Sequence, residues 1–108
     1  MFIDKIQLRN GITQYTYWEE LIDVPLGILW VKIYTGNSGK QIAFLQNAMT
    51  AYYFRNKGIC SVLHNAVLND TDVLLTCSGS DEGGKEFLIK FGFKYNKDLD
   101  IWSFIKRR

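Results

Sequence analysis

The fold is decided by residues 41–76, which read QIAFLQNAMTAYYFRNKGICSVLHNAVLNDTDVLLT. Gln41–Met49 is an apolar run that predicts a strand. From Gly58 onward the period changes, because apolar residues recur at the i, i+3, i+4, i+7, i+8 spacing of a helix with one buried face: Ile59, Val62, Leu63, Ala66 and Val67. We expect this helix to end near Asn69-Asp70. The run Val73–Thr76 then predicts a buried central strand parallel to the first. Together these elements form a strand–helix–strand crossover.

The N-terminal segment predicts a β-hairpin. Apolar runs at Phe2–Leu8 and Ile12–Trp18 flank Asn10-Gly11, a two-residue turn that accepts positive φ. A helix over Tyr15–Asp23 is the alternative, but β-branched and aromatic residues disfavour it.

A second hairpin is expected before the crossover. Pro25 restarts the chain, and Leu26–Tyr34 is rich in Ile, Leu, Val, Trp and Tyr. The cluster Gly36-Asn37-Ser38-Gly39 then supplies the turn into Gln41–Met49. The first half of the chain is therefore expected to be antiparallel sheet.

The segment after the crossover predicts a loop, a short helix and a last hairpin. Lys85–Phe91 can make two helical turns, which Gly92 ends at its C′ position. The loop before this helix is expected at Ser78–Gly84. After the helix we expect a strand at Phe93 to Tyr95, a polar bend at Asn96–Asp100 and a last strand at Ile101–Ile105.

These elements follow the order β-β-β-β-α-β-α-β-β. They predict an α+β fold, α/β by looser usage, with a mixed and mostly antiparallel sheet of about seven strands and two helices. The chain has 108 residues, 47% of them apolar, so residues 1–108 are expected to form a single domain.

The composition limits the classes of site. A net charge of +2 is too small for a general polyanion binder, so any anion site must be local. Two cysteines and one histidine cannot complete the usual zinc site, and no metal is expected. Met1–Asn10 carries charges that interrupt a signal-peptide core, and Val24–Tyr34 is about half the length that spans a bilayer. We therefore expect a soluble, cytoplasmic protein with reduced thiols.

The junction Arg55-Asn56-Lys57-Gly58-Ile59-Cys60 carries the chemistry. It joins an apolar strand to a helix, and a helix start presents unpartnered N–H groups and the positive end of the helix dipole. Gly58 allows the backbone to approach a phosphate closely, and Arg55 and Lys57 add charge-assisted hydrogen bonds. Taken alone, the spacing is more typical of a solvated basic turn with a cap glycine than of an anion site.

Residues 41–93 resemble the core of the GCN5-related N-acetyltransferase (GNAT) family. The junction is similar to that family's Arg/Gln-x-x-Gly-x-Gly/Ala loop, with Cys60 in the last position, and Phe87–Phe93 is similar to its closing helix with the terminal Gly-Phe. The resemblance implies an acetyl-CoA-dependent N-acetyltransferase, in which an amine of a protein or small molecule attacks the thioester directly. It also implies binding of the pantetheine arm by backbone groups of Ala48, Met49 and Thr50, and of the pyrophosphate by residues 55–60.

The sequence departs from the family pattern at several positions. Leu88 stands where a Tyr often protonates the departing thiolate, Asp81 replaces a frequent Asn next to the cofactor, and Cys60 replaces a small residue. The candidate catalytic substitutes are Tyr53, Cys77 and Ser78, with Tyr52 beside them, since all are expected near the ends of the two parallel strands. Cys77 is also typical of an inert thiol, and His64, the single imidazole, of a structural histidine.

Two further expectations concern the partners. The short Asn10-Gly11 turn leaves no room for the two helices that fuller members carry there, so that side is expected to be open toward a protein acceptor or a second subunit, and a homodimer is one option. The run Tyr52–Arg55 combines aromatic and cationic residues, which is also typical of a surface that binds single-stranded nucleic acid, but the low net charge argues against such binding. No membrane contact is expected. The alternative to an enzyme is a catalytically inactive GNAT-fold protein that serves as a binding module.

Overall fold

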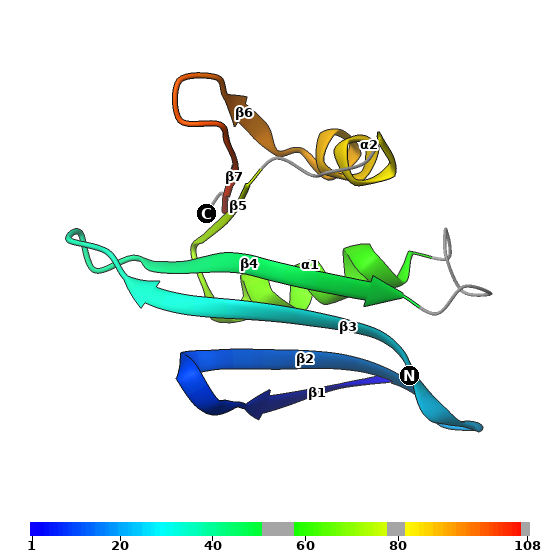
Figure 1. The fold of residues 1–108 in the computed structure, drawn as a ribbon. Helices are drawn as coiled ribbons and strands as arrows, with labels where there is room; N and C mark the ends of the chain where they lie inside the picture. Colours follow the sequence, from blue (N-terminus) through cyan, green and yellow to red (C-terminus); the bar gives the residue numbers. More distant parts are fainter. Residues whose placement is uncertain (51–57, 78–81, 107–108) are drawn as a thin grey trace.

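The computed structural model describes residues 1–50, 58–77 and 82–106. Within these residues, seven strands form one mixed sheet in the order β1-β2-β3-β4-β5-β7-β6, accompanied by two α-helices and one 3₁₀ turn (Figure 1). The elements are β1 (Phe2–Gln7), η1 (Arg9–Gly11), β2 (Ile12–Glu19), β3 (Ile22–Thr35), β4 (Gln41–Thr50), α1 (Ile59–Asp70), β5 (Val73–Cys77), α2 (Glu82–Phe91), β6 (Lys94–Asn96) and β7 (Ile101–Ile105). The predicted α+β class and element order are confirmed.

The two N-terminal hairpins form as predicted. Asn10 and Gly11 have φ values of 67° and 74°, and the Leu8 N–H donates to the Ile12 carbonyl (2.7 Å). The turn contains three residues, Arg9–Gly11, instead of the expected two. The second hairpin turns at residues 36–40, where Gly39 has a φ of 83°.

Two predicted boundaries were wrong. β3 begins at Ile22, so Pro25 lies inside this strand instead of before it. Pro25 is tolerated because it lies opposite Trp18, where the β2–β3 register shifts and the regular ladder is interrupted. α2 begins at Glu82, three residues before the expected start at Lys85.

The core lies between the sheet and helices α1 and α2. Leu29, Val31, Ala43 and Leu74 of the sheet are 0–1% exposed, and Leu63 and Val67 of α1 cover them at 2% and 0%. α2 joins the same layer, because its Phe87 and Phe91 pack against His64 of α1. The structure is thus a sheet with both of its described helices on one face.

His64 and Leu68 extend the buried face of α1 beyond the stripe expected from the sequence. They are 4% and 7% exposed, whereas Val62 and Ala66 are only half-buried. α2 shifts the buried stripe, since it covers the side of α1 that carries His64. Among the described residues, no helix is both long and apolar enough to cross a membrane.

Candidate functional site

Strands β4 and β5 pair for a short distance and then part. Their parallel register runs from Ile42 opposite Val73 to Phe44 opposite Leu75. Beyond that point β4 continues to Thr50, while β5 stays paired with β7 as far as Cys77 opposite Ile101. A wedge therefore opens between the C-terminal halves of two parallel strands, the end of a sheet where ligands generally bind in α/β architectures.

A β-bulge on β4 lies at the narrow end of this wedge. Val31 pairs with Leu45, but the preceding Trp30 pairs with Asn47, so Gln46 is the extra residue. A bulge bends its strand and changes the direction of the following peptide groups. It thereby turns Ala48–Thr50, the residues predicted for the pantetheine arm, away from the line of β5.

Peptide groups of a strand alternate between its two edges, and β3 occupies one edge of β4 along this segment. Every second peptide group after the bulge therefore points into the wedge. The Ala48 N–H donates to the adjacent Asn47 Oδ1 (2.8 Å). The wedge thus offers main-chain groups that can pair with an extended, amide-containing chain.

Helix α1 begins at Ile59 after a glycine, and no side-chain cap is present among the described residues. Its first helical hydrogen bond runs from the Val62 N–H to the Gly58 carbonyl (3.0 Å), and Gly58 provides no side-chain cap. The N–H groups of Ile59, Cys60 and Ser61 therefore have no acceptor within the helix. Gly58 has a φ of 80°, and a Cβ added there would meet no described atom within 4 Å. The helix start is electropositive, and no described residue fills the space beside Gly58.

Gly27 brings the helix start and the end of β4 together. It pairs with Thr50, and a Cβ at this position would lie 2.7 Å from Ile59 Cγ2 and 3.1 Å from Leu63 Cδ1. The first turn of α1 therefore packs directly on the backbone of β3. Sequence reasoning missed Gly27, although an isolated glycine inside an apolar strand is a signal of close approach.

Cys60 and His64 are structural in this arrangement. His64 Nδ1 lies 2.7 Å from the Cys60 carbonyl oxygen, so this nitrogen carries the proton and donates. Cys60 Sγ lies 3.7 Å from the same Nδ1. Burial raises the pKa of the Cys60 thiol to about 11 and lowers the pKa of His64 to about 4. At neutral pH the thiol is protonated and the imidazole is a neutral, weak base.

The other described candidates lie as follows. Cys77 is an exposed free thiol at the end of β5. Leu88 is 6% exposed and packs in the core, where it can neither donate nor accept a proton. The remaining predicted site residues, Tyr53, Arg55, Asn56, Lys57, Ser78 and Asp81, lie outside the described residues and stay predictions. The described ranges contain no group of three or more His, Cys, Asp or Glu that could hold a metal ion.

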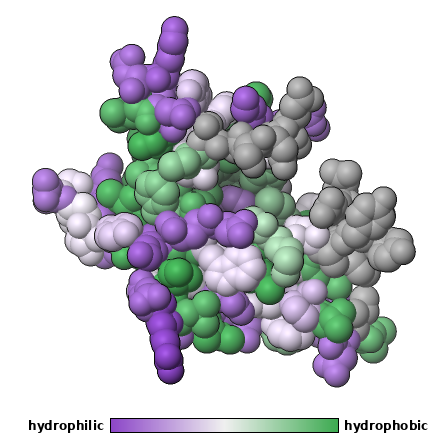
Figure 2. All heavy atoms as spheres, viewed as in Figure 1, coloured by the Kyte–Doolittle hydropathy of each residue, from purple (hydrophilic) through white to green (hydrophobic). Residues whose placement is uncertain are grey.

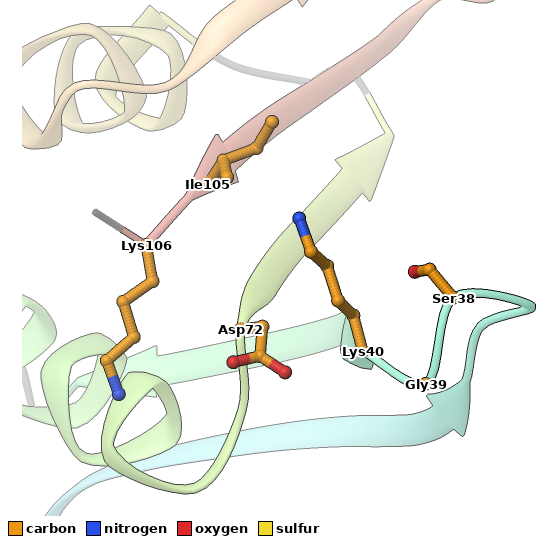
Figure 3. Close-up of a pocket in the computed structure, with 6 residues that line it drawn as sticks. All are labelled: Ser38, Gly39, Lys40, Asp72, Ile105 and Lys106. Carbon is orange, nitrogen blue, oxygen red and sulfur yellow. The ribbon is translucent and has the colours of Figure 1, made fainter. Parts of the chain in front are cut away.

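A depression of about 460 Å³ lies at the opposite end of β4 and β5 (Figure 3). Asp72 accepts a hydrogen bond from the Gln41 N–H (2.9 Å), and its carbonyl accepts one from the Lys106 N–H (2.9 Å). The Lys106 ammonium donates to the Leu68 carbonyl (2.8 Å). These bonds tie β4, the end of α1, β5 and the segment after β7 together, so we interpret the depression as a structural joint.

No protein-family model matches the sequence, and no curated protein matches it. Solved structures match its fold. Arabidopsis thaliana NAA60 in complex with a bisubstrate analogue aligns with a TM-score of 0.71 at 8% identity, over 90% of this chain and 76% of that one. An acetyltransferase of the GNAT family from Staphylococcus aureus Mu50 gives 0.70 at 13%, over 90% and 69%. The aminoglycoside N-acetyltransferase AAC(6')-Iy in complex with CoA gives 0.67 at 14%, over 92% and 78%.

The chain therefore has the fold of the GCN5-related N-acetyltransferases. The order of β4, the helix start at Gly58 and β5 is the order that the sequence predicted for residues 41–76.

Proposed function

We propose that this chain is an acetyl-CoA-dependent N-acetyltransferase. The observation that carries the proposal is the wedge between β4 and β5, with the uncapped start of α1 at its wide end. A CoA ester needs both features, because its pantetheine arm is extended and amide-containing and its pyrophosphate is a dianion. Structures with the same fold in complex with CoA or a bisubstrate analogue support the choice of cosubstrate.

In the proposed reaction, an uncharged amine attacks the thioester carbonyl directly. The new N–C bond forms, the C–S bond breaks, and the thiolate of CoA leaves. The extra proton on nitrogen passes to water or an unassigned base, and the thiolate takes a proton from solvent, since Leu88 cannot supply one. In this proposal, backbone N–H groups after Gln46 that point into the wedge would stabilise the developing oxyanion. Alignment of amine and thioester supplies the rest of the acceleration.

Thermal unfolding with added acetyl-CoA tests the proposal. A ligand that binds only the folded state at a hundred times its Kd stabilises by about 2.7 kcal/mol, which raises the Tm of a domain of this size by roughly 10 °C. Arg55→Ala combined with Lys57→Ala should abolish the rise. An unchanged Tm at millimolar acetyl-CoA would overturn the proposal.

Gly58→Ala is the sharper variant, and Gly11→Ala is its matched control. Both glycines have positive φ (80° and 74°), and no described atom lies within 4 Å of a Cβ built at either position, so both substitutions should cost about 1 kcal/mol of stability. Only Gly58→Ala places a methyl group where the phosphate would approach. Acetyl-CoA affinity should fall at least tenfold for Gly58→Ala and stay unchanged for Gly11→Ala. Equal affinities of the two variants would contradict the assigned phosphate site.

The second candidate function is a non-catalytic GNAT-fold binding module. The burial of Leu88 in the core favours it, because no phenol is available at that position to protonate the thiolate. Release of free CoA thiol, followed colorimetrically with a panel of amines, separates the two functions. Turnover supports the enzyme, whereas stabilisation by acetyl-CoA without turnover on any amine supports the binding module.

A further inference from the structure

The sheet has a second face, which α1 and α2 do not cover. Tyr15 marks the helix side, because its hydroxyl donates to Asp70 of α1 (2.8 Å). Neighbouring residues of a strand point to opposite faces, and directly paired residues share a face. The registers therefore place a set of largely apolar side chains on the other side, here called the open face: Phe2, Asp4, Ile6, Leu8, Ile12, Gln14, Thr16, Trp18, Ile28, Trp30, Lys32, Tyr34, Ile42, Phe44, Asn47, Met49, Val73 and Leu75.

Several large apolar side chains of the open face reach solvent. Phe2, Ile6, Leu8 and Met49 are 52%, 44%, 41% and 56% exposed. In the view of Figure 1 helix α1 lies behind the strands, and Figure 2 shows apolar and near-neutral residues over this region with hydrophilic ones between them. A parallel strand pair such as β4–β5 is normally covered on both faces. The open face is thus an unusual surface for a monomer.

The size of the open face suits a dimer. Five strands at about 4.8 Å spacing give a width of about 24 Å, and six residues at about 3.3 Å give a length of about 20 Å. The resulting plane has an area of about 500 Å², and the side chains that project from it make the accessible surface larger than this value. It therefore approaches the roughly 800 Å² per partner that a standard stable interface buries.

The charges of the open face are complementary to each other. Ile6, Gln14 and Trp30 lie in one row across β1, β2 and β3. Asp4 lies two residues to one side of this row on β1, and Lys32 lies two residues to the other side on β3. Gln14 is therefore midway between the two charges. A two-fold axis that passes over Gln14, lies in the contact plane and runs perpendicular to the line from Asp4 to Lys32 would place Asp4 of each copy against Lys32 of the other copy.

We propose that this chain forms a two-fold symmetric dimer, in which the open face packs against the open face of a second copy. The apolar side chains would fill the contact between two sheets, as in a β-sandwich, and the two Asp4–Lys32 pairs would fix the register. This proposal does not depend on acetyl-CoA binding.

Sedimentation of the purified chain over the micromolar range tests for the dimer. The wild type should sediment as a dimer, and Ile6→Lys as a monomer, since the new ammonium would enter the apolar contact. Ile6 is already 44% exposed, so the variant should keep its fold, which circular dichroism checks. Ile89→Lys is the matched control, because Ile89 is 63% exposed on α2, outside the open face. A monomeric wild type, or a dimer that survives Ile6→Lys, would overturn the proposal.

Charge reversal tests the register. Asp4→Lys alone places two like-charged pairs in the interface, and Lys32→Asp alone does the same with the opposite sign. Each should raise the dimer Kd by roughly tenfold or more. An equimolar mixture of the two variants makes both pairs complementary again, so dimers should return as heterodimers. Failure of the mixture to associate more tightly than either variant would contradict the two-fold register.

Discussion

At the residue scale, His64 links the packing of α1 and α2 to pH. Its ring lies between Phe87 (centroids 4.7 Å apart) and Phe91 (5.6 Å), and its Nδ1–H donates to the Cys60 carbonyl. Burial is the main cause of its low pKa of about 4, and the hydrogen bond opposes the shift only in part. The folded state therefore excludes the proton that the unfolded chain binds near pH 6.5.

The sign of the pH effect follows from this difference. The full contribution of neutral His64 is present above pH 6.5 and is lost progressively as the pH falls toward 4. By pH 5 the loss should reach about 2 kcal/mol of unfolding free energy. Urea denaturation at pH 7.5 and pH 5 measures this loss of unfolding free energy. His64→Phe is the control, because it keeps an aromatic ring at this position and has the same carboxylates as the wild type, so its remaining pH dependence comes from those carboxylates. An equal pH-dependent loss in wild type and His64→Phe would show that His64 is not responsible.

At the element scale, the crossing of α1 over β3 depends on the missing side chain of Gly27. Gly27→Ala would force a methyl group to within 2.7 Å of Ile59 Cγ2, so we expect a loss of about 1–3 kcal/mol in unfolding free energy. Ile59→Ala removes the atom that clashes. The double variant should therefore lose less than the sum of the two single losses, as measured by urea denaturation of all four chains. Strictly additive losses would mean that the clash is relieved elsewhere.

The sequence predicts the elements whose signals are local. Alternating and helical periods identified the four N-terminal strands and α1, and Gly58 and Gly92 marked helix ends that the structure confirms with φ values of 80° and 113°. The start of β3 was missed because Pro25 normally signals a break, and only the irregular pairing with Trp18 accommodates it. The start of α2 was missed because the Gly83-Gly84 pair disfavours a helix in isolation.

The candidate site was predictable only where its signals are local in the sequence. The glycine at the helix start is readable from spacing, and the family resemblance supplied its ligand. Gly27 could not be assigned without knowing that α1 crosses β3 at that point. The burial of His64 depends on α2, which is distant in sequence, so its structural role follows from tertiary contacts and not from helical periodicity alone.

At the scale of the whole molecule, the asymmetry between the two faces of the sheet is the dominant feature. One face carries α1 and α2, and the other presents the open face to its surroundings. If a second copy covers the open face, folding and association are coupled, because separating the copies exposes apolar surface. The stability of the fold then depends on protein concentration, whereas the stability of a monomer does not.

We therefore expect the Tm of the wild type to rise with protein concentration. A tenfold increase favours a dimer by about 1.4 kcal/mol, and this free energy is shared by the unfolding of two chains of 108 residues. The corresponding rise is about 3 °C for each tenfold step. Calorimetry over two such steps measures it, with Ile6→Lys expected to give a constant Tm and Ile89→Lys expected to follow the wild type. A dimer that dissociates as its two chains unfold must have a Tm that depends on protein concentration. A wild-type Tm that does not change with concentration would therefore mean that no second copy covers the open face.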